Sequence, residues 1–453
     1  MSTTELYMDE EEIQEFITET FSHNRDYRMY SYGEEGAEYG VCPFITFYIY
    51  THNHCAIGEN PEVGVSHDDD FLPLSHEVIE LYQELQTLTD VPFLRCYNSK
   101  TQNWVKTTPE KMGREFLQEH AKLAAIDGYK EFWMKATSDE SSGASACWAI
   151  SAEVTDNPWM RFTTVKISFR DKWFRAGNNR QVWRAFVQKW IERLQPEQCY
   201  SGYEIGTTTT GVGGAYESDV MERICADYFY GLDVDHPGKM GFHNHDDKDG
   251  YIDYTALGSG LRAPTWSFML SPLWRNKLGK SIEEVKAALH HPDIRITEIP
   301  YAANPHNPNG EPALWIQLGE LSLYPVSEGV PELPMIANKL IRPIRCNLLK
   351  LYTLDPWEDD PNPRFDFENS PKWMARFDED SSWPNKQGKR KIALVGTVHE
   401  RVEGGEPCPQ DGHWWTPAGD PGRGYFKKGD AMPNFPASKY GATIWYRVEA
   451  EEE

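Results

Sequence analysis

Residues 131–169 read EFWMKATSDESSGASACWAISAEVTDNPWMRFTTVKISF, and this stretch decides the fold class. It predicts three strands, at Glu131–Thr137, Ala146–Val154 and Arg161–Phe169, because apolar and β-branched residues gather in short runs between turn residues. A turn rich in Ser and Gly, Asp139–Ser145, joins the first two runs. Consecutive strands joined in this way favour an antiparallel meander.

A helix at Asn178–Leu194 is predicted after these strands, and Pro196 ends it. Its apolar residues recur at helical spacing and form one wide stripe. The stripe consists of Val182, Trp183, Phe186, Val187, Trp190, Ile191 and Leu194. Such a stripe is typical of a helix that packs one face against a core.

The rest of the chain supplies further helices and strands in clusters. Helices are predicted at Asp9–Glu19, Leu74–Leu88, from the N-cap Thr108 and Pro109 onward, Tyr216–Tyr230, Ser281–His290 and Leu333–Ile341. Strands are predicted at Val41–His52, Ile294–Ile299, Ala313–Leu318, Leu348–Leu354, Lys391–Glu400 and Thr443–Val448, and Trp266–Leu270 is an apolar run. Because the two kinds of element do not alternate strictly, we predict an α+β fold of antiparallel sheets packed with helices.

The composition changes after residue 355. Residues 1–355 are predicted to form the α+β region, and a division into two subdomains near residues 196–215 is left open. Residues 356–385 carry many Pro, Asp, Asn and Trp and predict a linker. Residues 386–453 predict a small β-rich C-terminal module.

The charge balance restricts the possible partners. The chain has 70 acidic and 45 basic side chains, a formal net charge of −25. This excess disfavours nucleic acids and anionic membranes, whose binding relies on Lys and Arg. It favours a basic protein partner, although acidity for solubility alone is the alternative. The N-terminal residues show no secretory signal and no apolar run is long enough to span a membrane, so we expect a cytoplasmic protein.

Motifs for catalysis or metal binding are weak. The eight Cys are scattered without a CxxC pair, which is typical of buried thiols in a reducing cytosol. The segment Tyr203–Gly214, YEIGTTTTGVGG, lacks both the Gly-Lys-Ser/Thr and the GxGxxG spacing of phosphate loops and favours a strand followed by a turn. His243 and His245 are the best metal candidates, but a polar surface loop explains them more simply, and His290-His291 suits a helix C-terminus.

No Ser or Cys nucleophile motif and no HExxH is found. We therefore assign no catalytic, cofactor-binding or metal-binding residue and expect a protein that is not an enzyme. Acidic clusters in expected loops are the candidate partner-binding residues, with a solvated surface as the alternative for each. They are Asp68, Asp69, Asp70, Asp246, Asp247, Glu358, Asp359 and Asp360, and Asp378-Glu379-Asp380 is a similar run.

Several landmarks resemble a family of type VI secretion immunity proteins. They are Tyr200–Tyr203 (YSGY), Tyr228–Asp233 (YFYGLD), Gly260–Leu270 (GLRAPTWSFML), Lys277–Gly279 (KLG), Ala313–Gly319 and Leu340–Arg345. A C-terminal set resembles the closing module of other polymorphic-toxin immunity proteins. It comprises Pro407–Trp415 (PCPQDGHWW), Lys428–Pro433 (KGDAMP) and Gly441–Tyr446 (GATIWY), with His413 as a departure before the Trp pair.

The resemblance implies stoichiometric binding of a cognate toxin. The family is associated with nuclease toxins of the restriction-endonuclease-like, VRR type, so the implied partner is a basic nuclease. An adaptor that escorts an effector, and a metal-dependent enzyme that acts on the toxin, are the alternatives. The resemblance carries over no site residues and no cofactor.

Overall fold

The computed structural model divides the chain into two compact units, Met1–Lys389 and Arg390–Glu453. The structure describes residues 30–32, 37–39, 41–49, 68–98, 101, 103–126, 130–138, 148–155, 163–205, 222–240, 260–303, 307–346, 351, 365, 369–384, 401–416, 423–435 and 443–448. In this part of the chain, no helix is long and apolar enough to cross a membrane.

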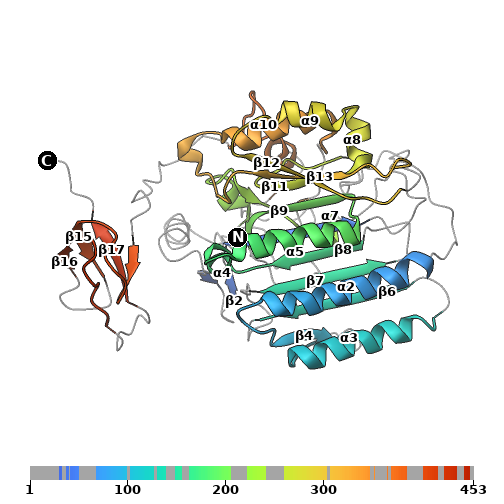
Figure 1. Cartoon of the computed structure of the whole chain (residues 1–453), viewed down its shortest axis with the longest axis horizontal. Coiled ribbons are helices and arrows are strands. Elements are labelled where there is room, and N and C mark those ends of the chain that lie inside the picture. Colours follow the sequence, from blue (N-terminus) through green and yellow to red (C-terminus); the bar gives the residue numbers. More distant parts are fainter. Residues whose placement is uncertain are drawn as a thin grey trace, which may run out of the picture. The chain divides into compact units, whose positions relative to one another are not determined.

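A sheet of 11 described strands dominates the first unit, in the order β12-β13-β11-β9-β3-β8-β7-β6-β4-β5 with β10 beside β9 (Figure 1). The strands are β3 Val41–Ile49, β4 Arg95–Asn98, β5 Asn103–Lys106, β6 Glu131–Thr137, β7 Ala149–Thr155, β8 Thr163–Ser168, β9 Gln198–Ile205, β10 Leu232–Asp233, β11 Ser267–Leu270, β12 Ile294–Ile299 and β13 Ala313–Leu318. All neighbours pair antiparallel except β10 and β9. A separate hairpin joins β1 Tyr30–Tyr32 to β2 Ala37–Tyr39.

The predicted meander is present as β6, β7 and β8, which pair in sequence order. The α+β class is thereby confirmed. Strand β9 lies in the middle of the sheet, between β3 and β11. The sheet therefore continues through residues 198–205, where a division into subdomains had been left open.

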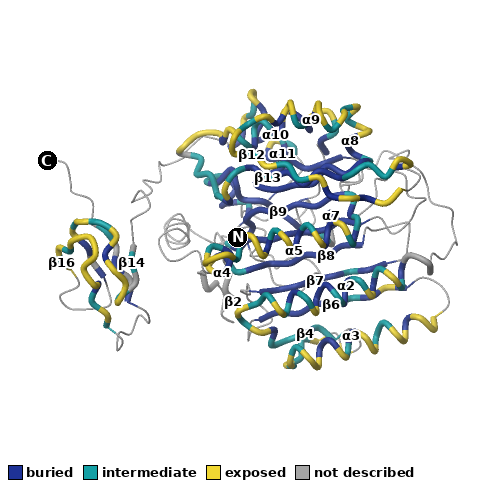
Figure 2. The backbone as a smooth tube through the Cα atoms, in the orientation of Figure 1, coloured by how far each residue is buried: buried dark blue, intermediate teal, exposed yellow. Residues whose placement is uncertain are grey.

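Helices cover one face of this sheet, and shorter helices pack on the other. The first set is α2 Asp68–Leu88, α3 Pro109–Leu123, α4 Asp171–Arg175 and α5 Asn179–Leu194, and the second includes α7 Pro237–Met240, α8 Pro272–Leu278, α9 Ile282–Ala288, α10 Glu332–Ile341 and α11 Asn369–Met374. Two short 3₁₀ helices are η2 Val326–Glu328 and η3 Arg342–Ile344. Because side chains alternate along a strand, Ile45 and Phe47 of β3 lie in the core beneath α2 and α5, and Phe44 and Tyr48 lie in the opposite core. Figure 2 shows that the central strands of the sheet are mostly buried.

Local sequence explains the helix ends. Thr108 accepts a hydrogen bond from the backbone of Lys111, and Ser281 and Glu284 form a capping box at the start of α9. Gly279 ends α8 in the left-handed conformation, with φ +68°. The Leu-Gly landmark of the sequence is therefore a helix C-cap.

Helix α5 confirms the predicted stripe with one exception. Val182 is exposed, whereas the other six stripe residues are buried. One residue step turns about 100° around a helix, so Val182 lies at the edge of the face centred on Trp183 and Phe186.

Residues 356–385 differ from the expected linker where the structure describes them. Helix α11 lies in this range, and Phe365, Trp373, Met374 and Trp383 are buried in the second core. Ring centroids of Phe365 and Trp383 stack 6.1 Å apart. The two tryptophans of this range that the structure describes, Trp373 and Trp383, are core residues.

The C-terminal unit contains a small four-stranded antiparallel sheet, ordered β14-β17-β15-β16. Its strands are β14 Arg401–Glu403, β15 Gly412–Trp415, β16 Arg423–Phe426 and β17 Ile444–Val448. Cys408, Trp414, Met432 and Trp445 form its buried core. The landmark residues of the C-terminal resemblance thus include this core.

Some predicted elements lie outside the described residues. These are Asp9–Glu19, Leu348–Leu354 apart from Leu351, and Lys391–Glu400. Of Tyr216–Tyr230, residues 222–226 are helical and 227–230 form a turn.

Candidate functional site

Only one of the three predicted acidic clusters lies among the described residues. Asp68, Asp69 and Asp70 begin α2, six residues before the predicted start, so they lie in a helix and not in a loop. Asp246, Asp247 and Glu358–Asp360 lie outside the described residues, as do His243 and His245. The described residues contain no group of three potential metal ligands among His, Cys, Asp and Glu.

Asp378, from the fourth acidic run, is buried in an ion pair. Arg345 donates to both of its carboxylate oxygens, at 2.7 and 2.9 Å, and the Asn338 amide donates to it at 2.6 Å. Burial would raise the pKa of Asp378, but these bonds outweigh it and lower the pKa. This carboxylate attaches the segment after α11 to α10 and is not a solvated recognition residue.

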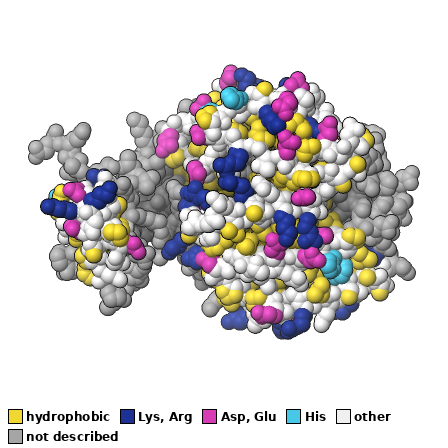
Figure 3. Space-filling model, viewed as in Figure 1, with side chains coloured by type: hydrophobic (Ala, Val, Ile, Leu, Met, Phe, Trp, Pro, Cys, Tyr) yellow, Lys and Arg dark blue, Asp and Glu magenta, His cyan; other side chains and the backbone are white. Residues whose placement is uncertain are grey.

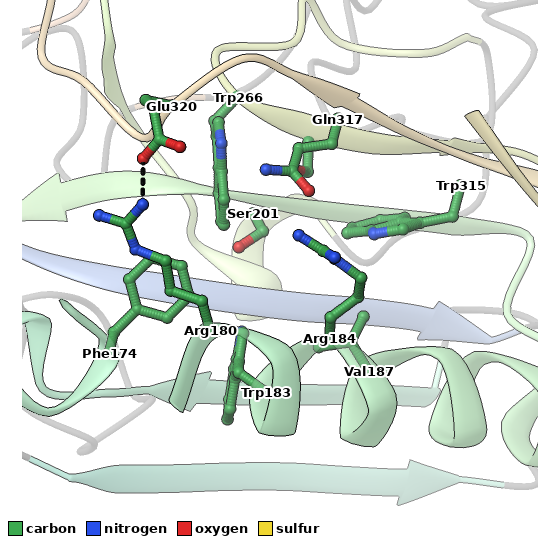
Figure 4. A pocket seen from close by; sticks show the side chains of 11 residues that line it. Phe174, Arg180, Trp183, Arg184, Val187, Ser201, Trp266, Trp315, Gln317 and Glu320 are labelled. Carbon is green, nitrogen blue, oxygen red and sulfur yellow. Dashed lines mark hydrogen bonds and ion pairs between the residues drawn. The ribbon is translucent and has the colours of Figure 1, made fainter. Parts of the chain in front are cut away.

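A pocket opens between α5 and the part of the sheet formed by β9, β11 and β13 (Figure 4). It is lined by Phe174, Arg180, Trp183, Arg184, Val187, Ser201, Trp266, Ser267, Trp315, Gln317 and Glu320. Its volume is about 40 Å³, on a scale where a single water needs roughly 10–15 Å³. The pocket therefore has room for a few water molecules or for the end of one side chain.

Helical and strand periodicity bring these residues together. Arg180 and Arg184 are one helical turn apart at the edge of the α5 stripe, beside Trp183 and Val187. Trp315 and Gln317 are two residues apart on β13, and because side chains alternate along a strand, both lie on the same face of the sheet. The aromatic walls and the two arginines meet because α5 packs across these strands.

The two arginines differ in their partners. Arg180 Nη1 lies 2.6 Å from Glu320 Oε2 at the rim, and its guanidinium carbon lies 5.7 Å from the centre of the Phe174 ring. Arg184 points into the pocket toward Trp315 and Ser201 and has no hydrogen bond or ion pair with any described residue (Figure 4). Burial lowers the pKa of Arg184, and repulsion from Arg295 lowers it further.

Arg295 lies on β12, opposite Gln317 of β13. It is exposed, so it adds positive charge near the pocket without closing it. On the face seen in Figure 3, Lys and Arg side chains gather in the strip between α5 and the β12–β13 edge. This strip is basic although the whole chain is acidic.

A second group of charged residues is fully buried on the opposite face of the sheet. Lys166 Nζ lies 2.6 Å from Glu204 Oε2 and also donates to the backbone oxygen of Asp235 at 2.6 Å. Arg262 Nη2 lies 2.7 Å from Asp235 Oδ2 and 3.4 Å from Asp233 Oδ2. We call these five residues the buried charge network.

Neutral groups complete this network. The hydroxyls of Thr46 and Tyr48 donate to Asp235 Oδ1 at 3.1 and 3.2 Å. Arg262 donates to the backbone oxygen of Val234 at 3.0 Å and lies 4.3 Å from the centre of the Tyr200 ring. The network joins β3, β8 and β9 to the segments around residues 232–235 and 262.

The pKa directions differ within the network, because burial raises the pKa of Glu204 to about 8 and also raises the pKa of Asp233. Burial raises the pKa of Asp235, but Arg262 and Lys166 outweigh burial, and the pKa falls below its usual value. Burial lowers the pKa of Lys166, but Glu204 and Asp235 outweigh burial and raise it. Strongly shifted pKa values occur both in catalytic sites and in structural ion networks. Here each cation is paired with carboxylates of the network, which favours the structural role.

Sequence reasoning missed the pocket. Arg180 and Arg184 read as the solvated side of a helix, and Glu320 is 140 residues away from Arg180. A local signal was present, because Arg beside Trp is the composition enriched at binding hot spots. Four pocket residues are Trp or Phe, but only the fold brings them together.

Comparisons with known proteins concern the fold. No family model matches the sequence, and no curated protein matches it. Among solved structures, the chain is similar to the "Pseudomonas aeruginosa T6SS protein PA0821", with 16% identity, a TM-score of 0.51, and coverage of 78% of this chain and 87% of that chain. This likeness shows a shared fold across most of both chains.

A second similar structure is the toxic C-terminal tip of CdiA from Pseudomonas aeruginosa in complex with an immune protein. It has 13% identity and a TM-score of 0.18 and covers 36% of this chain and 86% of that chain. A likeness of this size carries no argument about this protein.

Proposed function

We propose that this chain is an immunity protein that binds a cognate type VI secretion toxin and neutralises it in a stoichiometric complex. The observation that carries the proposal is the fold shared with the T6SS protein PA0821 over 78% of the chain. The sequence landmarks that resemble a type VI immunity family support the same role.

The proposed toxin is a basic nuclease. This part rests on the family resemblance and on the net charge of −25, which would attract a protein with a basic substrate cleft. The proposed mode of action is binding without chemistry on the toxin. An effective inhibitor of this kind needs an interface of standard size, about 800 Å² per partner.

Co-expression tests the proposal. The product of the neighbouring gene is expressed alone and with this chain, growth is scored, and the purified mixture is examined on a sizing column. We expect rescue of growth and a stable complex near one to one. No rescue and no complex would contradict the proposal.

A titration separates the proposal from its two alternatives. A binding inhibitor should protect only when it approaches one equivalent of toxin. Protection at a small fraction of one equivalent would indicate an enzyme that modifies the toxin. A complex that leaves the toxin active would indicate an adaptor.

A further inference from the structure

Arg184 is a half-buried cation that has no hydrogen bond or ion pair with a described residue, although Glu320 acts on it electrostatically. It lines the pocket between α5 and β13, and Arg295 repels it from the β12 side. A guanidinium that loses water without gaining a carboxylate is destabilised. A partner that brings a negative group into this pocket would therefore be favoured over one that does not.

The neighbouring Arg180 shows which group fits. Its guanidinium is paired with the Glu320 carboxylate at the pocket rim, with an N–O distance of 2.6 Å. Glu320 is 71% exposed, so solvent reaches this carboxylate on its other side. Glu320 also acts electrostatically on Arg184. The pocket thus already binds one carboxylate on one of its two arginines.

Size selects the ligand further. The volume of about 40 Å³ leaves room for the end of one side chain, such as a carboxylate group. Trp315 and Trp266 form apolar walls that would cover the aliphatic part of such a side chain. A planar guanidinium can bind both oxygens of a carboxylate at once.

We propose that this pocket receives the carboxylate of an Asp or Glu side chain presented by a protein partner, with Arg184 as its principal ligand. The partner is the toxin of the proposed function, and the inference rests on that function. The site would anchor the complex at one point on a chain whose overall charge is negative. Glu320 would compete with the incoming carboxylate for the two arginines.

Two substitutions at the pocket should change affinity in opposite directions. Arg184→Ala should weaken toxin binding at least tenfold, because the incoming carboxylate loses its principal partner, and Arg184→Lys should recover only part of this. Glu320→Gln should tighten binding severalfold, because the competing carboxylate is gone. General damage to the fold would weaken binding in both cases. Arg114→Ala is the matched control, since Arg114 is an exposed helical arginine on α3, and it should leave the dissociation constant unchanged.

A second probe does not need the toxin. The ligand is N-acetyl-glutamic acid amide, which carries one side-chain carboxylate. It is titrated into protein labelled with ¹⁵N-arginine and followed by NMR. The Arg184 Nε resonance is identified by its loss in Arg184→Lys. We expect this resonance to shift with the acid and not with N-acetyl-glutamine amide.

The outcomes separate the two proposals. If the toxin binds Arg184→Ala as tightly as it binds Arg114→Ala, this inference is overturned while the proposed function stands. If the wild-type chain binds no toxin, the proposed function fails. The titration with N-acetyl-glutamic acid amide then decides alone whether the pocket binds a carboxylate. A shift with a single-stranded oligonucleotide but not with the acid would overturn the inference in favour of phosphate binding.

Discussion

Replacing Arg262 with Met tests whether the buried charge network holds the fold together. The Arg262 side chain is fully buried, and Met keeps the aliphatic stem of Arg without the charged guanidinium. The change removes the 2.7 Å ion pair with Asp235 and the 3.4 Å ion pair with Asp233. It also removes the 3.0 Å hydrogen bond to the backbone oxygen of Val234.

The expected loss follows from what remains behind. Both carboxylates stay buried. Lys166 Nζ remains 3.8 Å from Asp235 Oδ1, and Arg376 still acts electrostatically on Asp233. Removing one partner of a buried ion pair costs about 3–5 kcal/mol, mostly because the other charge is left without compensation. We therefore expect Arg262→Met to lower the free energy of unfolding by about 3–5 kcal/mol.

Urea unfolding followed by circular dichroism at 222 nm measures this loss. The described helices all lie in the first unit, so this signal reports that unit. The double variant Arg262→Met/Asp235→Asn should lose less than the sum of the two single changes, since it removes both members of one pair. Arg295→Met is the control and should change stability by less than about 0.5 kcal/mol, because Arg295 is exposed and has no ion pair with a described residue.

Two results would refute this reasoning. A loss below about 1 kcal/mol for Arg262→Met would show that the described pairing does not stabilise the fold. Unchanged stability together with failure to neutralise the toxin would assign the network to partner binding instead.

Three further predictions follow from single features. Burial raises the pKa of Glu197 to about 7, although a hydrogen bond from Ser271 acts in the opposite direction. Because the folded protein holds this proton more tightly than the unfolded chain, the contribution of Glu197 to stability should be lost as pH rises from 4.5 toward 7. Glu197→Gln should therefore raise the melting temperature at pH 8 and not at pH 4. Ser281→Ala removes the capping box of α9 and should cost about 1 kcal/mol in urea unfolding, whereas an equal stability would contradict the assigned cap. If the net charge of −25 steers a basic toxin, raising salt from 50 to 500 mM should slow association in a stopped-flow assay, and a constant rate would exclude steering.

The sequence was most informative where structure depends on neighbouring residues. Glu131–Thr137, Ile294–Ile299 and Ala313–Leu318 are strands with the predicted bounds, because short apolar runs between turn residues are a local signal. Local rules also misplaced the start of α2. The helix was predicted from Leu74, but it begins at Asp68 and contains Pro73.

The site depended on contacts that local patterns do not contain. Charged residues such as Lys166 and Asp235 are expected at the surface when only the sequence is known. Both are buried here because they pair with each other. Likewise, Arg180 meets Glu320 only because α5 packs against the strand that precedes Glu320. The position of β9 in the middle of the sheet is also a property of the whole topology, since its neighbours β3 and β11 are distant in sequence.

The acidic chain and its basic pocket are compatible because they would act at different distances. Long-range attraction depends on the summed charge, which is −25 and would draw in a basic toxin. A fixed complex also needs a contact that defines its register, and desolvated arginines beside aromatic residues are typical of such contacts. Arg184 would reject a partner surface that presents a Lys or Arg at this point, since like charges brought together cost several kcal/mol. A carboxylate on an otherwise basic toxin would therefore distinguish the cognate partner from other basic proteins attracted by the same net charge.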